Sequence, residues 1–280
     1  LAELIRAVSQ EPVEISVLPA ADRGLRGLRV DVRTAGAGAW ITSPPTATGI
    51  AAGHAHEEHA HEEGERHGHG HHAAPAAHHA CRGLREILAI LEHPALPRRT
   101  RALAAAAFRR LAEAEAKVHG VTPDAVHFHE VGAADAIADI VGCCFALEQL
   151  GVEGVRVGPL PAGRGTLHCA HGEMPNPAPA TIRLLEGFEI VQTGEPFELV
   201  TPTGAALLAA WRHELAAPPD RGRVLGSGCG FGRRTLRERP NLLRATLMES
   251  VAPASPEGES EEELVLLETN LDKQIGRAHV

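Results

Sequence analysis

The chain is poor in large aromatic side chains. Its 280 residues include no tyrosine, two tryptophans and six phenylalanines, so aromatic residues make up 3% of the total, whereas hydrophobic residues make up 44%. Aromatic side chains normally supply much of the area buried in a core. This core must therefore be built mainly from alanine, leucine, valine and isoleucine, in one or two domains of roughly 100–200 residues each.

Further absences exclude several classes of protein. No apolar run approaches the roughly 20 residues of a membrane-spanning helix, and residues 1–10 lack the basic start and the cleavage site of a signal peptide. The formal net charge of −9 argues against a protein that binds nucleic acid through a basic surface. Five scattered cysteines do not resemble a disulfide framework. We expect a cytoplasmic protein with reduced thiols and without a nucleic-acid or membrane partner.

Histidine, in contrast, is concentrated in one segment, residues 50–80. Ten of the eighteen histidines lie there: His54, His56, His59, His61, His67, His69, His71, His72, His78 and His79. No apolar period runs through this segment, which predicts a disordered insertion. Imidazole and carboxylate groups bind late first-row ions, Ni²⁺ and Cu²⁺ more tightly than Co²⁺ and Fe²⁺. The segment is predicted to collect metal ions; the alternatives are a neutral linker or a purification tag, and its mid-chain position argues against a tag.

The remaining sequence alternates between helical and strand patterns, which predicts an α+β (mixed α/β) domain at residues 81–250. Apolar residues recur at steps of three and four over 98–119 and again over 135–150, and each of these helices is followed by a glycine. Other helices are expected at 84–92, 179–186 and 203–215, and strands at 125–128, 154–160, 189–192, 198–200, 223–226 and 241–249.

Both ends of the sequence suggest a fragment. Residues 1–49 are interpreted as a partial N-terminal part of the same domain, because the chain opens on Leu1 inside a helical pattern. Residues 251–262, rich in proline, serine and glutamate, are predicted to be a linker. Residues 263–280 are interpreted as the truncated start of a second α+β domain. Its last six residues, 275–280, match one reading frame of a common sequencing adapter, so we expect an artefactual tail.

One candidate metal site lies at the start of the predicted helix 135–150. His127 and His129 occupy positions i and i+2 of an extended segment and therefore share one face. Asp135 and Asp139 are four residues apart, on one face of the helix. Two imidazoles and two carboxylates form a ligand set that suits Ni²⁺, Zn²⁺, Mn²⁺ or Fe²⁺. The alternative is a structural network in which the histidines pair with the carboxylates and Asp135 serves the helix start.

A second candidate is the long loop 159–179, because long ordered loops often carry function. Arg164 is a candidate for binding a phosphate or carboxylate bidentately. The loop also carries His168, Cys169 and His171, which are candidate metal ligands in a weak His-Cys-x-His pattern.

Two further segments have the composition of phosphate-binding loops. Thr201, Thr203 and Gly204 open a predicted helix, where backbone amides can receive a phosphate; an ordinary threonine cap is the alternative. Residues 226–232 form a glycine-rich loop pattern, but they lack the lysine of a P-loop and do not complete a dinucleotide fingerprint.

Several long runs resemble the LarC family, which inserts nickel into the nickel-pincer cofactor. The similar segments, in order along the chain, are Phe108–Gly120, His127–Val141, Cys169–Thr181, Glu198–Ala205, Arg239–Asn241 and Leu267–Asp272. The resemblance extends from Arg82 to Asp272, and many members carry a variable histidine-rich insertion where this chain has His54–His79.

The resemblance implies a nickel-inserting lyase, a cyclometallase. Such an enzyme places Ni²⁺ in pyridinium-3,5-bisthiocarboxylic acid mononucleotide, is driven by CTP with Mg²⁺ or Mn²⁺, and makes a cofactor for lactate racemase and its relatives. Expected partners are CTP, the sulfur-transfer and racemase proteins of the same route, and further copies of the chain in a homo-oligomer. The family's opening segment and its CTP-binding C-terminal domain are missing from the sequence, so this fragment is expected to bind nickel without turning over.

The candidate residues take roles under this hypothesis. His127, His129, Asp135 and Asp139 are the catalytic nickel site, and His168 and His171 are the next ligands. The substrate phosphate is expected at Arg164 or at the turn formed by Thr201, Thr203 and Gly204. Two rival functions remain: a non-enzymatic nickel store or metallochaperone, and a metal-dependent hydrolase. The folded motifs have no role in a store, and no nucleophile or general-base motif supports a hydrolase.

Overall fold

The computed structural model describes residues 2–9, 12–34, 82–128, 134–169, 172–251, 264–265 and 268–269. The predicted histidine-rich insertion, nearly all of the predicted linker and the predicted tail lie outside these residues. The helices are α1 (Ala2–Ser9), α2 (Leu84–Leu91), α3 (Arg98–His119), the short 3₁₀ helix η1 (Pro123–Ala125), α4 (Ala134–Gln149), α5 (Pro179–Leu184) and α6 (Pro202–Glu214).

The strands are short except for four that belong to the largest sheet. They are β1 (Val13–Asp22), β2 (Leu25–Thr34), β3 (Arg82–Gly83), β4 (His127–Phe128), β5 (Arg156–Val157), β6 (Leu160–Ala162), β7 (Thr166–Cys169), β8 (Gly172–Pro175), β9 (Ile190–Gln192), β10 (Gly222–Phe231), β11 (Leu242–Ser250), β12 (Leu264–Val265) and β13 (Glu268–Thr269). The combination confirms the predicted α+β class.

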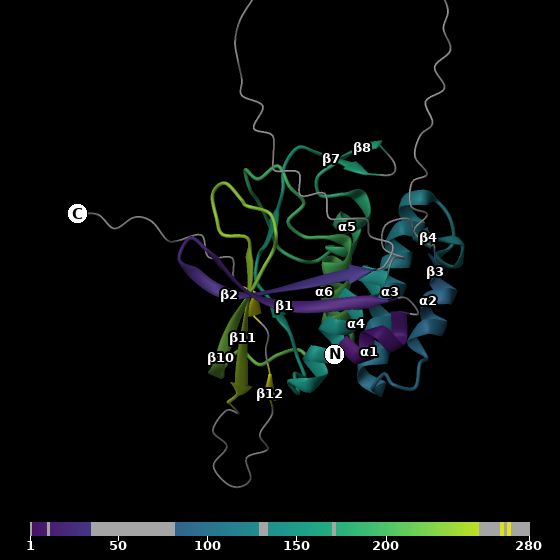
Figure 1. Ribbon diagram of the computed structural model, residues 1–280. Coiled ribbons are helices and arrows are strands. Elements are labelled where there is room, and N and C mark those ends of the chain that lie inside the picture. The colour runs from purple at the N-terminus through teal and green to yellow at the C-terminus, as the bar shows by residue number, and fades with distance from the viewer. Residues whose placement is uncertain are drawn as a thin grey trace, which may run out of the picture.

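The largest sheet has the strand order β1-β2-β10-β11-β12 and lies beside the helices (Figure 1). Strands β1 and β2 form an antiparallel hairpin, which meets β10 in parallel at Gly230 and Leu28. The two strands approach so closely here that a Cβ at Gly27 would lie 2.2 Å from the carbonyl oxygen of Cys229. Only glycine fits at this crossing, which attaches the hairpin to the rest of the sheet.

Helix α3 is the centre of the helical layer and contacts α2, α4, α5 and α6. Its buried face consists mostly of alanine, with Leu103, Phe108 and Leu111 among the larger side chains. The facing surface of α6 is also rich in buried alanine. As expected from the composition, the core is largely aliphatic; its aromatic contribution includes Phe108 and Phe128, whose ring centroids are 6.4 Å apart.

The end of α3 determines where the following residues lie. Gly120 adopts a left-handed conformation with φ of 68° and donates its amide to the carbonyl oxygen of Ala116, which terminates the helix. The chain then turns through η1 into β4, which pairs with β3. This reversal brings the segment after α3 back beside the last turns of the same helix.

Most of the predicted elements are confirmed, and two are wrong. The glycine-rich segment predicted as a loop at 226–232 is, through Phe231, part of β10, because β11 supplies a continuous partner strand. The strand predicted at 198–200 is a series of bends. The long loop 159–179 contains the strands β6, β7 and β8, and the hairpin β1–β2 was not anticipated. Among the described residues, no helix combines the length and apolarity needed to cross a membrane.

The dense packing of α3 gives a test of the core. Ala104 is fully buried, so the substitution Ala104→Leu should lower the free energy of unfolding by about 1–3 kcal/mol through overpacking. Ala102, on the exposed side of the same helix, is the matched control, and Ala102→Leu should change it by less than about 0.5 kcal/mol. Urea unfolding followed by circular dichroism measures both; equal effects would contradict the proposed packing.

Candidate functional site

A cavity of about 790 Å³ lies where the ends of several elements meet. It is bounded by the last turns of α3, by η1 and β4, by the first turns of α4 and α6, by β7 and β8, and by the loop after β10. The polar side chains that line it are Glu115, His119, His127, Asp135, Asp139, His168, Glu198, Thr201, Thr203 and Arg234. Its volume falls in the range of roughly 300–1,000 Å³ typical of small-molecule sites.

Strand β4 carries one buried and one exposed residue beside the cavity. Phe128 is 2% exposed and packs against Phe108, whereas His127 is exposed, and both contribute to the cavity lining. Neighbouring side chains of a strand point to opposite faces, so the burial of Phe128 fixes the direction of His127. The structure therefore places His127 in the lining of the same cavity as Asp135 and Asp139, while their predicted binding of one metal ion stays a prediction.

The two aspartates lie one turn apart at the start of α4. Asp135 accepts a hydrogen bond from the amide of Ala136 at 2.8 Å. Burial in the cavity wall, together with the negative charge of Asp135, raises the pKa of Asp139 from 3.8 to about 6. The carboxyl of Asp139 is thus easily protonated in the protein alone, and a bound cation would favour its ionised form.

The last turns of α3 add two residues that sequence reasoning missed. Glu115 and His119 line the cavity, and the His119 Nε2 atom lies 3.5 Å from Glu115 Oε2. Their spacing of four residues within the family-like run Phe108–Gly120 was the available signal. Glu198, in another such run, also lines the cavity.

The strand β7 and the start of α6 form another part of the lining. His168 lies on β7, in register with Glu173 of β8. Thr201 is the N-cap of α6: its hydroxyl accepts from the amide of Gly204 at 3.2 Å and lies 3.1 Å from the hydroxyl of Thr203. The ordinary threonine cap, which the sequence left as the alternative to a phosphate site, is therefore present, and the amide of Gly204 donates its hydrogen bond within this cap.

Other predicted residues are placed elsewhere or are not described. Arg164 is exposed and does not line the cavity. His129, His171 and the ten histidines of the segment 54–79 lie outside the described residues. Within the described ranges, no group of three or more histidine, cysteine, aspartate or glutamate side chains is already gathered closely enough to hold a metal ion.

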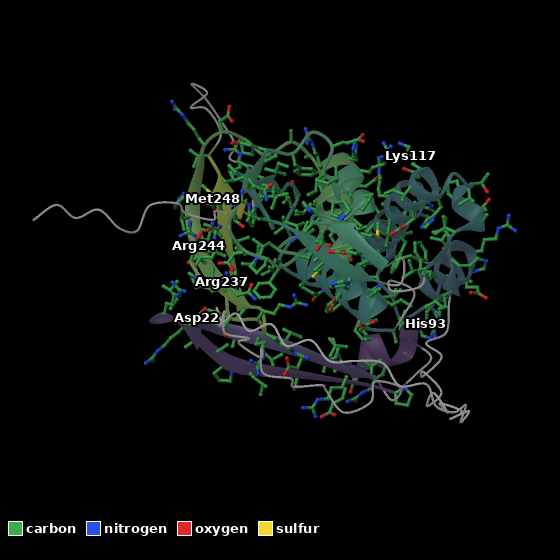
Figure 2. The ribbon with its side chains drawn as sticks, turned by 90° about the horizontal axis from the view of Figure 1, so that it is seen from above. Asp22, His93, Lys117, Arg237, Arg244 and Met248 are labelled. Carbon is green, nitrogen blue, oxygen red and sulfur yellow. The ribbon has the colours of Figure 1, made fainter. Side chains whose placement is uncertain are left out.

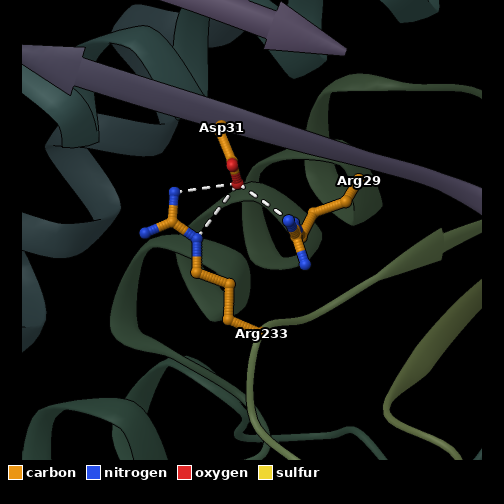
Figure 3. Close-up of polar contacts among 3 residues, drawn as sticks. All are labelled: Arg29, Asp31 and Arg233. Carbon is orange, nitrogen blue, oxygen red and sulfur yellow. Dashed lines mark hydrogen bonds and ion pairs between the residues drawn. The ribbon is translucent and has the colours of Figure 1, made fainter. Parts of the chain in front are cut away.

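The loop between β10 and β11 carries Arg234 into the cavity lining, and the adjacent Arg233 is fixed by a buried carboxylate (Figure 3). Asp31 of β2 is 7% exposed and accepts from Arg233 at 3.0 and 2.8 Å, with Arg29 at 3.3 Å. Burial alone would raise the pKa of Asp31, but the hydrogen bonds and charges of Arg233 and Arg29 outweigh it and hold that pKa below its usual value. Asp31 thereby ties the hairpin to this loop.

Glu195 fixes the same loop from the other side. Its fully buried carboxylate accepts from the amide of Arg237 at 2.9 and 3.1 Å and from that of Glu238 at 2.9 Å. The Asn241 side chain also donates to the carbonyl oxygen of Arg234 at 3.0 Å. Figure 2 shows Arg237, Arg244 and Met248 on the side of the molecule that carries β10 and β11, and Lys117 on the side of the helices.

The cavity combines imidazoles and carboxylates with an arginine. Histidine and carboxylate side chains are ligands for divalent first-row metals, and arginine is a ligand for anionic groups. Such a site suits a protein that handles a divalent metal ion together with an anionic compound.

The comparisons with known proteins identify the family. The sequence model of the family described as nickel insertion protein matches residues 1–279. The chain belongs to this nickel insertion protein family. No solved structure matches the chain significantly.

Curated relatives agree with this assignment. A protein of Pelobacter propionicus, provisionally named a nickel insertion protein, is 47% identical over 191 residues, which cover 68% of this chain and 47% of the relative. A protein of Akkermansia muciniphila, named pyridinium-3,5-bisthiocarboxylic acid mononucleotide nickel insertion protein, is 39% identical over 232 residues, 83% of this chain and 49% of the relative. The chain thus spans about half the length of the curated relatives it matches.

The raised pKa of Asp139 gives a test of the geometry. Replacement of Asp135 by Asn removes a negative charge one turn away, so the pKa of Asp139 should fall from about 6 while burial keeps it above its usual value. Because the folded protein holds this proton more tightly than the unfolded chain, the contribution of Asp139 to stability should decrease as the pH rises from about 4 to about 6. Carboxyl ¹³C NMR titration measures the pKa; an unchanged value in Asp135→Asn would show that the two carboxylates do not interact.

Proposed function

We propose that this chain is the nickel-binding and substrate-binding part of an enzyme that inserts Ni²⁺ into pyridinium-3,5-bisthiocarboxylic acid mononucleotide. The observation that carries the proposal is a cavity in which His127, Asp135, Asp139 and His168 share a lining with the start of α6. The Akkermansia relative is named for this reaction. Nickel is a substrate in this scheme, delivered to the cavity and transferred to the organic compound.

The proposed ligands follow from the positions around β4 and α4. His127, Asp135 and Asp139, which line the cavity, bind the incoming Ni²⁺, and His168 of the lining is a next ligand. His129 and His171 lie outside the described residues, and their parts as ligands rest on the sequence. The segment His54–His79 raises the local concentration of nickel, because many imidazoles bind such ions without one fixed geometry. The turn at Thr201 and Thr203 contributes hydroxyl groups to the substrate site, whereas Arg164 lies away from the lining and is given no part.

The remaining features of the proposal come from the family resemblance. The finished reaction forms carbon–nickel and sulfur–nickel bonds, as in a cyclometallase, and supplies a cofactor to lactate racemase and related enzymes. CTP with Mg²⁺ or Mn²⁺ belongs to the C-terminal part, of which β12 and β13 are described. The described cysteines Cys143, Cys144 and Cys229 are free, which supports a reducing cytoplasmic location.

One prediction of this proposal concerns the number of nickel sites. Calorimetric titration of this chain at neutral pH should reveal an ordered Ni²⁺ site that survives deletion of 54–79 and is lost in the double variant His127→Ala/His129→Ala. The matched control is His93→Ala/His213→Ala, which removes two histidines outside the cavity lining and should retain the site. Loss of all nickel binding upon deletion of 54–79 would instead favour the nickel store or metallochaperone.

The second prediction concerns the pH dependence of this site. Nickel ligands must be deprotonated, so affinity should decrease as the pH falls through about 6.5, the reference pKa of histidine. Protonation of Asp139, whose pKa is raised to about 6, also competes with nickel binding in the same pH range. Equilibrium dialysis of the chain lacking 54–79 between pH 7.5 and 5 measures the effect. Nickel retention that is unchanged at pH 5 would rule out histidine ligation.

A further inference from the structure

We propose that Arg234 binds the phosphate of the mononucleotide and so determines which end of the substrate faces the nickel ligands. The inference rests on the proposed function and deepens it. Arg234 belongs to the loop between β10 and β11, far in sequence from every predicted ligand, yet its side chain lines the same cavity as His127 and Asp139.

The charges of the lining favour Arg234 for this role. Among the described residues that line the cavity, Arg234 is the only arginine or lysine, and the other ionisable groups include the carboxylates of Glu115, Asp135, Asp139 and Glu198. A phosphate monoester carries about −1.5 to −2 charges at neutral pH. It would be repelled by the carboxylates and attracted to the guanidinium group, which matches phosphate geometry with two parallel N–H donors.

The neighbouring residues Arg233 and Arg234 differ in what their side chains contact. Arg233 is bound by the buried carboxylate of Asp31 (Figure 3). Arg234 lies over the ring of Phe197, with its guanidinium carbon 5.2 Å from the ring centroid, and within the described part of the chain no carboxylate pairs with it. Stacking engages the flat face of a guanidinium group and leaves its N–H edge available for an anion.

The main chain of Arg234 is held in place on both sides. Its carbonyl oxygen accepts from the Asn241 side chain, Asp31 fixes the residue before it, and Glu195 fixes the amides three and four residues after it. A guanidinium group on a fixed loop loses less conformational entropy on binding than one on a free loop. The loop therefore acts as a rigid support for an anion-binding side chain.

The orientation of the substrate follows from this assignment. With the phosphate at Arg234, the pyridinium ring extends into the remainder of the cavity, where His127, Asp135 and Asp139 lie. The ring and its thiocarboxylate groups then meet the incoming Ni²⁺. The reversed orientation would place the phosphate among carboxylates, which is electrostatically unfavourable.

The test compares the mononucleotide with its dephosphorylated nucleoside in nickel-free buffer, by calorimetry. The native chain should bind the mononucleotide more tightly than the nucleoside. Arg234→Ala should weaken mononucleotide binding by about 10- to 100-fold, the effect of losing one or two charge-assisted hydrogen bonds, and should leave nucleoside binding unchanged. Arg234→Lys, which keeps the charge, should lose less. Arg237→Ala removes the same charge from the same loop outside the lining and should match the native chain for both ligands.

The outcomes separate the inference from the proposed function. Equal affinities of the native chain for both ligands would overturn the role of Arg234, as would a loss in Arg234→Ala that is the same for both ligands or absent. In those cases the proposed function would stand, because the mononucleotide still binds. If the native chain binds neither ligand, the proposed function fails, and the inference fails with it.

Discussion

The close packing of α3 against its neighbours is the constraint on which the site depends. Alanine on α3 and on α6 allows these helices to approach closely, and both helices end or begin at the cavity. The last turns of α3 present Glu115 and His119, and the left-handed Gly120 returns the chain so that His127 reaches the same space. In this core, which has no tyrosine and few other aromatic residues, the ends of closely packed helices therefore position the functional side chains.

A second constraint joins the sheet to this helical layer. Asp31 and Glu195 are buried acidic residues, and each holds the loop between β10 and β11, one through the side chain of Arg233 and the other through backbone amides. A buried carboxylate is stable only when its charge and hydrogen-bonding capacity are satisfied. The hydrogen bonds that satisfy these two carboxylates therefore position the loop between β10 and β11, whose Arg234 lines the cavity.

The sequence predicted the helices well because their apolar periods are long and their ends carry glycine or proline. It did not predict the hairpin β1–β2 or the glycine-rich part of β10. These segments are strands because they pair with a neighbouring strand, and their own residues do not indicate a strand. Of the residues that line the cavity, the sequence predicted His127, Asp135 and Asp139 as one group, because they are close in sequence, and His168, Thr201 and Thr203 only as separate candidates. Arg234 joins them through tertiary packing, from a loop far along the chain, which no local spacing encodes. Glu115 lies only twelve residues before His127, and its spacing of four from His119 was the available signal.

The cavity lining carries both carboxylates and a guanidinium group, and this combination supports the proposed reaction. Helices α3 and α4 contribute Glu115, Asp135 and Asp139, while the loop after β10 contributes Arg234. Carboxylates attract both Ni²⁺ and the permanently cationic pyridinium ring, whereas the phosphate requires a cation. Burial, and in addition the negative charge of Asp135, raises the pKa of Asp139 to about 6, and an incoming Ni²⁺ would favour the ionised form of this carboxyl. Under the proposed function, Ni²⁺ and the ring bind beside these carboxylates, because both carry positive charge.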